Sequence, residues 1–179
     1  MSHYTNKLHA GASFPSLSVR LYDGGETDLI TPASGCDWQM VVVYRGKHCP
    51  MCTRYLNELA GYTETLRQIG VSLVAVSADS KSQVAQHLDE IDINFPLAFG
   101  LSEQQMKALG VYISEPRSAQ ETDHNFAEPG LFVINAQQQL QVVDISNNPF
   151  VRPDIKTLVN GLAWIRDPDN HYPIRGTHE

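Results

Sequence analysis

The chain has 179 residues, a net charge of −7, three cysteines and 42% hydrophobic residues. This is enough for one domain with its own core, so we expect residues 1–179 to form a single domain that folds without disulfides, with a core over about residues 14–166 and short tails. The acidic charge, with no basic stripe, argues against nucleic acid and anionic membrane surfaces as partners. There is no signal-peptide core near the start and no apolar run of membrane-spanning length, so we expect a cytoplasmic protein.

The first expected elements are two short strands, 18–21 and 27–30, joined by the hairpin signal Asp23-Gly24-Gly25. Residues 40–44 form a continuous apolar run, typical of a strand buried on both faces. The spacing of apolar residues then predicts a helix from about Pro50 to Ile69, ended by Gly70. Residues 71–77 predict a second buried strand, so strand, helix and strand make a parallel unit with a right-handed crossover.

The rest of the chain predicts helices over 82–91, 102–109 and 153–166, a short strand or extended turn over 95–99, and a hairpin of 131–134 with 140–145. A polar segment, 114–129, is longer than a typical connection, and we expect it to form one wall of the active site. We interpret its Glu121 and His124 as solvated loop charges.

Cys49-Pro50-Met51-Cys52 lies between the strand-like run and the helix that follows it. Pro50 suits a first helical turn, because its missing N–H would have no partner there. Cys49 is then at the helix N-terminus, where free N–H groups and the helix dipole favour an exposed, reactive thiolate. Cys52, one turn further on, is expected to be the more shielded sulfur. We therefore assign the attack to Cys49 and the closing of an internal disulfide to Cys52.

Arg45, Lys47 and His48 add positive charge before Cys49 and are expected to lower its pKa further. Arg45 is also compatible with a solvated loop charge, and we interpret His48 as shaping the loop rather than carrying a proton. A CxxC can be half of a zinc site, but that needs two more ligands, and only Cys36 and scattered histidines remain. We expect no metal, and we interpret Cys36 as a small, partly buried residue.

The order of elements and the motifs together resemble the thioredoxin superfamily, and more closely its AhpC/TSA (peroxiredoxin-like) branch with a CPxC site. The similarity runs from Phe14-Pro15 to the final helix and includes residues 43–52, 76–79, 95–99 and 129–135. It implies an α/β thioredoxin fold, a central mixed sheet flanked by helices, with an N-terminal β-hairpin extension. It also implies that Pro129 packs against the CxxC, and a cis peptide bond is expected before this proline.

The resemblance implies a thiol-based antioxidant oxidoreductase that reduces peroxides or disulfides through a redox-active disulfide of Cys49 and Cys52. No cofactor is expected, because the electrons reside in the sulfurs. An external thiol system, such as thioredoxin or glutathione, would supply them, and a homodimer is compatible with the family.

Five further residues are expected to belong to this site. Arg45 is the best side chain for stabilising developing negative charge, and its expected neighbours are Gly46, His48, Pro50 and Pro129. Gly46 stands where typical peroxiredoxins have Thr or Ser, three residues before the reactive cysteine. Two alternatives stay open: a disulfide reductase without useful peroxidase activity, and a redox sensor module that does not turn over substrate.

Overall fold

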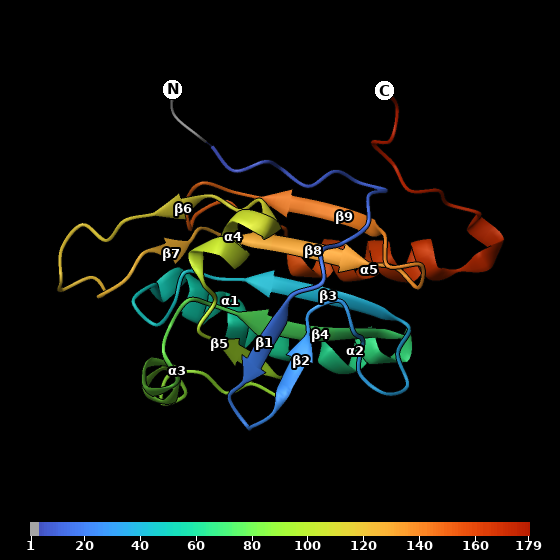
Figure 1. The fold of residues 1–179 in the computed structure, drawn as a ribbon. Coiled ribbons are helices and arrows are strands. Elements are labelled where there is room, and N and C mark those ends of the chain that lie inside the picture. The colour runs from blue at the N-terminus through green and yellow to red at the C-terminus, as the bar shows by residue number, and fades with distance from the viewer. Residues whose placement is uncertain (1–3) are drawn as a thin grey trace.

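The computed structural model in Figure 1 describes residues 4–179 of the chain, and within them seven strands form one mixed sheet of order β2-β1-β5-β4-β3-β8-β9. These strands are β1 (Ser18–Leu21), β2 (Glu26–Asp28), β3 (Trp38–Val43), β4 (Val71–Val76), β5 (Leu97–Phe99), β8 (Gly130–Ile134) and β9 (Leu140–Ile145). β3 pairs in parallel with β4 and antiparallel with β8, so the central strands give the mixed sheet that the resemblance implied. β1 and β2 form the N-terminal hairpin at one edge.

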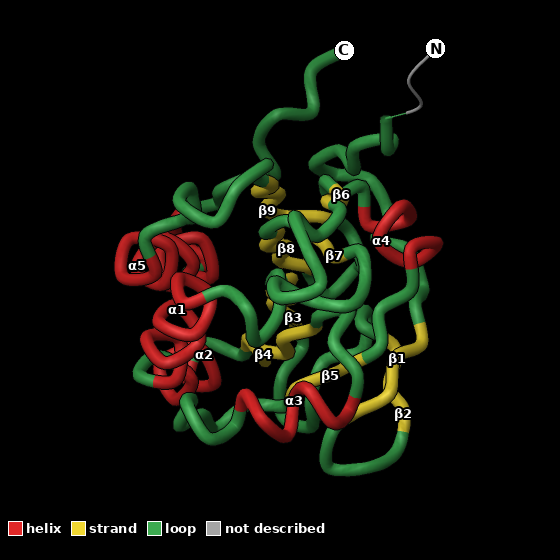
Figure 2. The backbone as a smooth tube through the Cα atoms, turned by 90° about the vertical axis from the view of Figure 1, so that its left-hand side faces the viewer, coloured by secondary structure: helices red, strands yellow, loops and turns green. Residues whose placement is uncertain are grey.

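Helices cover both faces of this sheet (Figures 1 and 2). On one side lie α1 (Pro50–Ala60), α2 (Thr63–Gln68) and α5 (Ile155–Arg166); α4 (Glu103–Leu109) lies on the other. α3 (Lys81–His87) adds its buried Val84 to the cluster beneath α1. Along β3, Met40 and Val42 face that cluster, whereas Val41 and Val43 face the cluster beneath α4. This alternation explains the continuous apolar run, since a strand with both faces covered has no solvent side.

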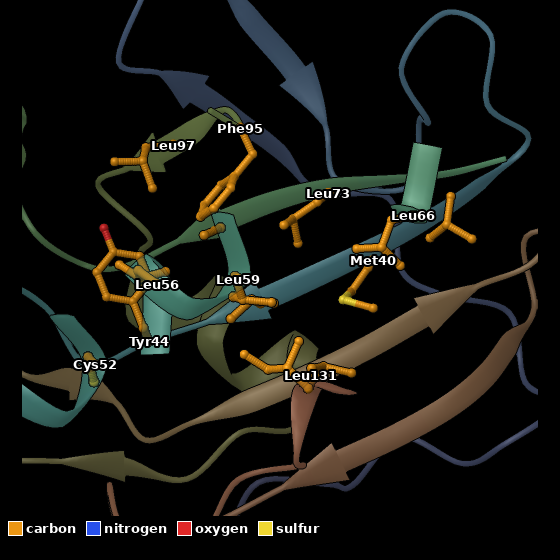
Figure 3. Close-up of a cluster of buried hydrophobic side chains, with 14 of the residues drawn as sticks. Met40, Tyr44, Cys52, Leu56, Leu59, Leu66, Leu73, Phe95, Leu97 and Leu131 are labelled. Atoms are coloured by element: carbon orange, nitrogen blue, oxygen red, sulfur yellow. The ribbon is translucent and has the colours of Figure 1, made fainter. Parts of the chain in front are cut away.

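The cluster that fixes α1 is drawn in Figure 3. The buried residues of α1 are Cys52, Leu56 and Leu59, spaced four and three positions apart, so they form one stripe facing the sheet. Cys52 lies at one end of the cluster, near Tyr44, the residue that follows β3. The helix that carries the CxxC is therefore held by apolar packing along its length, with the second cysteine inside that packing.

Two helices differ from their expected extent. The helix expected over 50–69 is divided into α1 and α2, because the Gly61 N–H donates to the Glu58 carbonyl three residues back and the helical ladder ends there. Glycine favours such an end, since it loses more backbone freedom in a helix than other residues. α3 ends at His87 rather than at residue 91. None of the helices in residues 4–179 combines the length and apolarity needed to cross a lipid bilayer.

Candidate active site

Cys49 is the N-cap residue of α1, and Pro50 is the first helical residue. The Cys49 backbone is extended (φ −110°, ψ 101°), and its carbonyl accepts the N–H groups of Cys52 at 3.0 Å and Thr53 at 3.1 Å. Its Sγ accepts the Cys52 N–H at 3.2 Å. The sulfur thus takes the place of the serine or aspartate oxygen of an ordinary N-cap. A negative charge on it faces the free N–H groups of the first turn.

The two sulfurs have opposite protonation preferences. A hydrogen bond from the Cys52 side chain is the largest cause that lowers the pKa of Cys49, to about 5, with further help from the Cys52 N–H, Arg152 and Arg45 against the cost of burial. Burial first, and then the neighbouring Cys49, raise the pKa of Cys52. At neutral pH Cys49 is therefore the thiolate and Cys52 keeps its proton.

The expected exposure of Cys49 is wrong. Its relative exposure is 1%, against 0% for Cys52, and both residues belong to the cluster beneath α1. The Cys49 side chain turns back onto its own helix, because its Sγ accepts the Cys52 N–H. The asymmetry between the two thiols therefore comes from hydrogen bonds and charges rather than from access to solvent.

Arg45 is not a solvated loop charge, since its side chain is only 17% exposed. Its Nε lies 3.1 Å from Oε2 of the buried Glu128, and its guanidinium packs over the Phe126 ring at 4.7 Å. Glu121 lies 3.8 Å from Arg45, and its side chain is 8% exposed, so its interpretation as a solvated charge is also wrong. Burial raises the pKa of Glu128, while the Ser114 hydroxyl, which donates to Oε1 at 2.8 Å, lowers it.

These contacts make the polar segment one wall of the site. Its two ends pair as β6 (Ile113–Ser114) and β7 (Phe126–Ala127), which brings Ser114 and Glu128 together. The segment 114–129 is thus closed at its base and held against Arg45 by two carboxylates.

Gly46 is required by a close approach in the loop before Cys49. Its φ is +139°, and a Cβ there would lie 2.5 Å from Oδ1 of Asp79. Asp79 is fully buried, and its Oδ2 accepts the Lys47 N–H at 2.8 Å. Its Oδ1 lies 3.3 Å from Nε2 of His124, which is 23% exposed and so is not the solvated charge expected. The carboxylate of Asp79 therefore occupies the space that a threonine or serine side chain would need.

His48 packs edge-on against Phe126 at 4.5 Å between ring centroids. Burial, followed by the nearby Arg45, lowers the pKa of His48 to about 4, so the ring is neutral at neutral pH. Within residues 4–179, neither ring nitrogen has a hydrogen-bond partner. The geometry therefore gives His48 a packing contact in the loop and offers its ring no proton relay.

The peptide bond before Pro129 is trans, so the expected cis bond is wrong; residues 4–179 contain no cis peptide. The chain runs straight from β7 into β8 here, because the Glu128 N–H donates to the Tyr112 carbonyl and the Pro129 carbonyl accepts the Ser146 N–H. Pro129 nevertheless lines a small cavity together with Cys52.

Sequence reasoning missed Arg152, whose side chain contacts the Cys52 sulfur directly. Its Nη2 donates to the Cys52 Sγ at 2.6 Å, across 100 positions of sequence, and its guanidinium lies over the Tyr55 ring at 5.1 Å. No local pattern marks it, since it stands in a loop before the last helix. The one signal available was a lone arginine next to Pro153 at a predicted helix start.

All three cysteines are free thiols, and Cys36 lies at the far end of β3 from the other two. The six residues of β3 separate it from the site by about 20 Å, at ~3.3 Å per strand residue. Within residues 4–179, no group of three or more His, Cys, Asp or Glu side chains is arranged to hold a metal ion.

Comparisons with known proteins identify the family and the fold. The model of the AhpC/TSA family matches residues 10–143. A cysteine-to-serine mutant of the peroxiredoxin 6 of Arenicola marina is similar, with TM-score 0.74 and 13% identity over 90% of this chain and 75% of that one. A peroxiredoxin-like protein from Aquifex aeolicus has a TM-score of 0.70 and 18% identity, over 88% of this chain and 87% of that one. Mycobacterium bovis AhpC has a TM-score of 0.71 and 15% identity, over 97% of this chain and 99% of that one. No curated protein sequence matches the chain.

Proposed function

Because this chain belongs to the AhpC/TSA family, we propose that it is a thiol peroxidase that reduces hydroperoxides through a dithiol–disulfide cycle of Cys49 and Cys52. Thiol-based peroxidase or oxidoreductase chemistry in general follows from the family and from the peroxiredoxin-like fold. One observation carries the finer proposal: the Cys49 sulfur is the N-cap acceptor of α1, where it takes the Cys52 N–H at 3.2 Å, and the Cys52 thiol lies one turn away. The hydrogen bonds to Cys49 lower its pKa to about 5, whereas burial raises that of Cys52.

The cycle has two internal steps. The Cys49 thiolate attacks the terminal oxygen of the hydroperoxide and the O–O bond breaks, so that Cys49 becomes a sulfenic acid. The leaving alkoxide or hydroxide takes a proton from solvent and departs as an alcohol or water. The Cys52 sulfur then attacks the Cys49 sulfur, the S–O bond breaks, and the leaving hydroxide takes the Cys52 proton and departs as water. An external dithiol returns both sulfurs to the reduced state by thiol–disulfide exchange.

The burial of both sulfurs supports a small hydroperoxide as the oxidant. Hydrogen peroxide or a short alkyl hydroperoxide needs little room at a Cys49 that is 1% exposed. Arg45 and the N–H groups of the first turn of α1 are the groups that would stabilise the charge developing on the leaving oxygen. We expect the reductant to be a thioredoxin-like or glutathione system of a reducing cytoplasm.

A second candidate is a thiol–disulfide reductase, favoured by Gly46. This glycine leaves no hydroxyl three residues before Cys49 to bind a peroxide oxygen, and the Asp79 carboxylate takes up the space where one would stand. In this case the first step is attack on a disulfide sulfur, with a thiol leaving in place of an alcohol.

The test is stopped-flow oxidation of the reduced protein by hydrogen peroxide, by an organic hydroperoxide and by a small model disulfide, side by side. The proposal expects the fastest second-order rate with one of the two peroxides, complete loss of that rate in Cys49→Ser, and a persistent sulfenic acid in Cys52→Ser. A model disulfide that reacts much faster than either peroxide would establish the reductase instead.

A further inference from the structure

The guanidinium of Arg152 is directed at one sulfur atom. Its Nη2 donates to the Cys52 Sγ at 2.6 Å. Within residues 4–179, no carboxylate lies within 4.0 Å of it, whereas Arg45 is paired with Glu128 and is close to Glu121. The charge of Arg152 is therefore available to the resolving cysteine, while that of Arg45 is largely balanced.

The position of Arg152 is held from two sides. Its guanidinium lies over the Tyr55 ring at 5.1 Å, a cation–π contact that holds the end of the side chain. The Tyr55 hydroxyl donates to the carbonyl of the next residue, Pro153, at 2.9 Å. One residue of α1, a single turn after Cys52, thus anchors both the side chain and the backbone of the loop that carries Arg152.

The surroundings make this contact strong. Cys52 is fully buried and Arg152 is partly buried, and the cavity that both line, of about 10 Å³, is near the lower limit for one water molecule, so solvent is largely kept from the sulfur end of the pair. The ionisable side chains that face the pair in this cavity are Tyr44, at the end of β3, Tyr55, on α1, and Asp144, on β9. Burial raises the pKa of all three, so both tyrosines stay neutral.

From this geometry we propose that Arg152 is the catalytic residue of the resolving step: it holds the Cys52 sulfur as a thiolate once Cys49 has been oxidised. The inference rests on the proposed Cys49/Cys52 cycle and assigns the group that governs its second half.

Oxidation of Cys49 changes the balance of charge at Cys52. In the reduced protein, burial and the Cys49 thiolate both raise the pKa of Cys52, and Arg152 opposes them. When Cys49 becomes a sulfenic acid or a mixed disulfide, its negative charge is gone, while Arg152 stays in place. Arg152 then favours release of the Cys52 proton as the Cys52 sulfur bonds to Cys49. The proton ends on the leaving hydroxide or thiolate, which departs as water or as a thiol.

The two steps can be timed separately with 2,2′-dipyridyl disulfide in a Cys36→Ser background. Attack by Cys49 breaks the disulfide of the probe and releases one pyridinethione; attack by Cys52 on the mixed disulfide releases the second. Arg152→Met should slow the second release about 10- to 100-fold, since a hydrogen bond to a charged group is worth about 1.5–3 kcal/mol. The first release should change less than about twofold at neutral pH, because a Cys49 pKa of about 5 leaves the thiolate dominant even after a rise of about one unit.

Two variants control for structure. Arg152→Lys keeps a cation near the sulfur and should recover part of the second rate, although lysine lacks the planar fork. Arg20→Met removes an arginine that likewise packs over an aromatic ring, Phe99 at 4.8 Å, and should leave both releases unchanged. A second measurement uses Cys49→Ser, in which the negative charge of the Cys49 thiolate is removed and Arg152 stays beside Cys52: here Arg152→Met should raise the pH midpoint of Cys52 alkylation.

The proposal would be overturned if Arg152→Met released the second pyridinethione at the wild-type rate, or if it slowed both releases equally. An unchanged midpoint in the Cys49→Ser background would do the same. The proposed function fails differently: hydrogen peroxide and organic hydroperoxides would then leave Cys49 unoxidised, while the probe still gave two releases whose second phase depended on Arg152.

Discussion

Replacing Cys52 by alanine removes the side-chain hydrogen bond that contributes most to the low pKa of Cys49. The backbone N–H of residue 52 still donates to the Cys49 Sγ, because alanine keeps it. A hydrogen bond to a charged group is worth about 1.5–3 kcal/mol, and one pH unit corresponds to about 1.4 kcal/mol. The pKa of Cys49 should therefore rise by about one to two units in Cys52→Ala.

The sign of the effect sets the pH at which it is visible. The Cys49 thiolate is present above its pKa of about 5 and is lost as the pH falls through that value. At pH 8 the variant and the parent should therefore be alkylated at similar rates. At pH 5, a rise of one to two units should slow the variant by about five- to fiftyfold, since the thiolate fraction falls about tenfold per unit below the pKa.

The assay is the pH dependence of iodoacetamide alkylation in a Cys36→Ser background, so that Cys49 alone reacts in Cys52→Ala. Cys52→Ser is the matched control, because a serine hydroxyl can still donate to the thiolate and should shift the midpoint less than alanine does. If alanine leaves the midpoint at its parental value, or if serine and alanine shift it equally, the Cys52 side chain does not activate Cys49.

Two further substitutions test the loop before Cys49 and the contact between Arg45 and the polar segment 114–129. Gly46→Ala should lower the free energy of unfolding, measured by urea denaturation, by about 2–4 kcal/mol, because the new Cβ would meet Asp79 and the φ is positive. The control is Gly24→Ala, at φ +111° with nothing within 4 Å of the new Cβ, which should lower the free energy of unfolding by about 1 kcal/mol. Equal losses in the two variants would rule out the close contact at Gly46. Arg45→Met should leave the buried Glu128 without its cation, which lowers the free energy of unfolding by about 1–3 kcal/mol at neutral pH and raises the pH midpoint of Cys49 alkylation. Adding Glu128→Gln to this variant should recover part of the lost stability. Strictly additive losses in the double variant would mean that the two side chains are not coupled.

The parts of the fold and the site that depend on short-range patterns could be predicted from the sequence. The apolar run of β3, Pro50 at the first turn and the apolar spacing of α1 together place Cys49 at a helix N-terminus, and the structure has it as the N-cap. The same spacing continues to Ile69 through Gly61, so it could not reveal that the helix is divided there.

The parts that sequence patterns missed are long-range contacts. Arg152 reaches Cys52 across 100 positions, and Asp79 reaches Lys47 across 32. Glu128 meets Arg45 only because β6 and β7 close the polar segment. The burial of Cys49 likewise depends on what packs against the first turn of α1, and neither spacing nor composition encodes such neighbours.

The central claim, a Cys49–Cys52 cycle, is tested most directly by mapping the thiols after one equivalent of hydrogen peroxide. Free thiols are blocked, the protein is digested, and disulfide-linked peptides are identified by mass spectrometry. The account predicts one main product, an intramolecular Cys49–Cys52 disulfide with Cys36 blocked as a free thiol, since Cys36 lies about 20 Å away along β3. A main product that links Cys36 to Cys49, or that leaves Cys52 as a free thiol while Cys49 is oxidised, would contradict it.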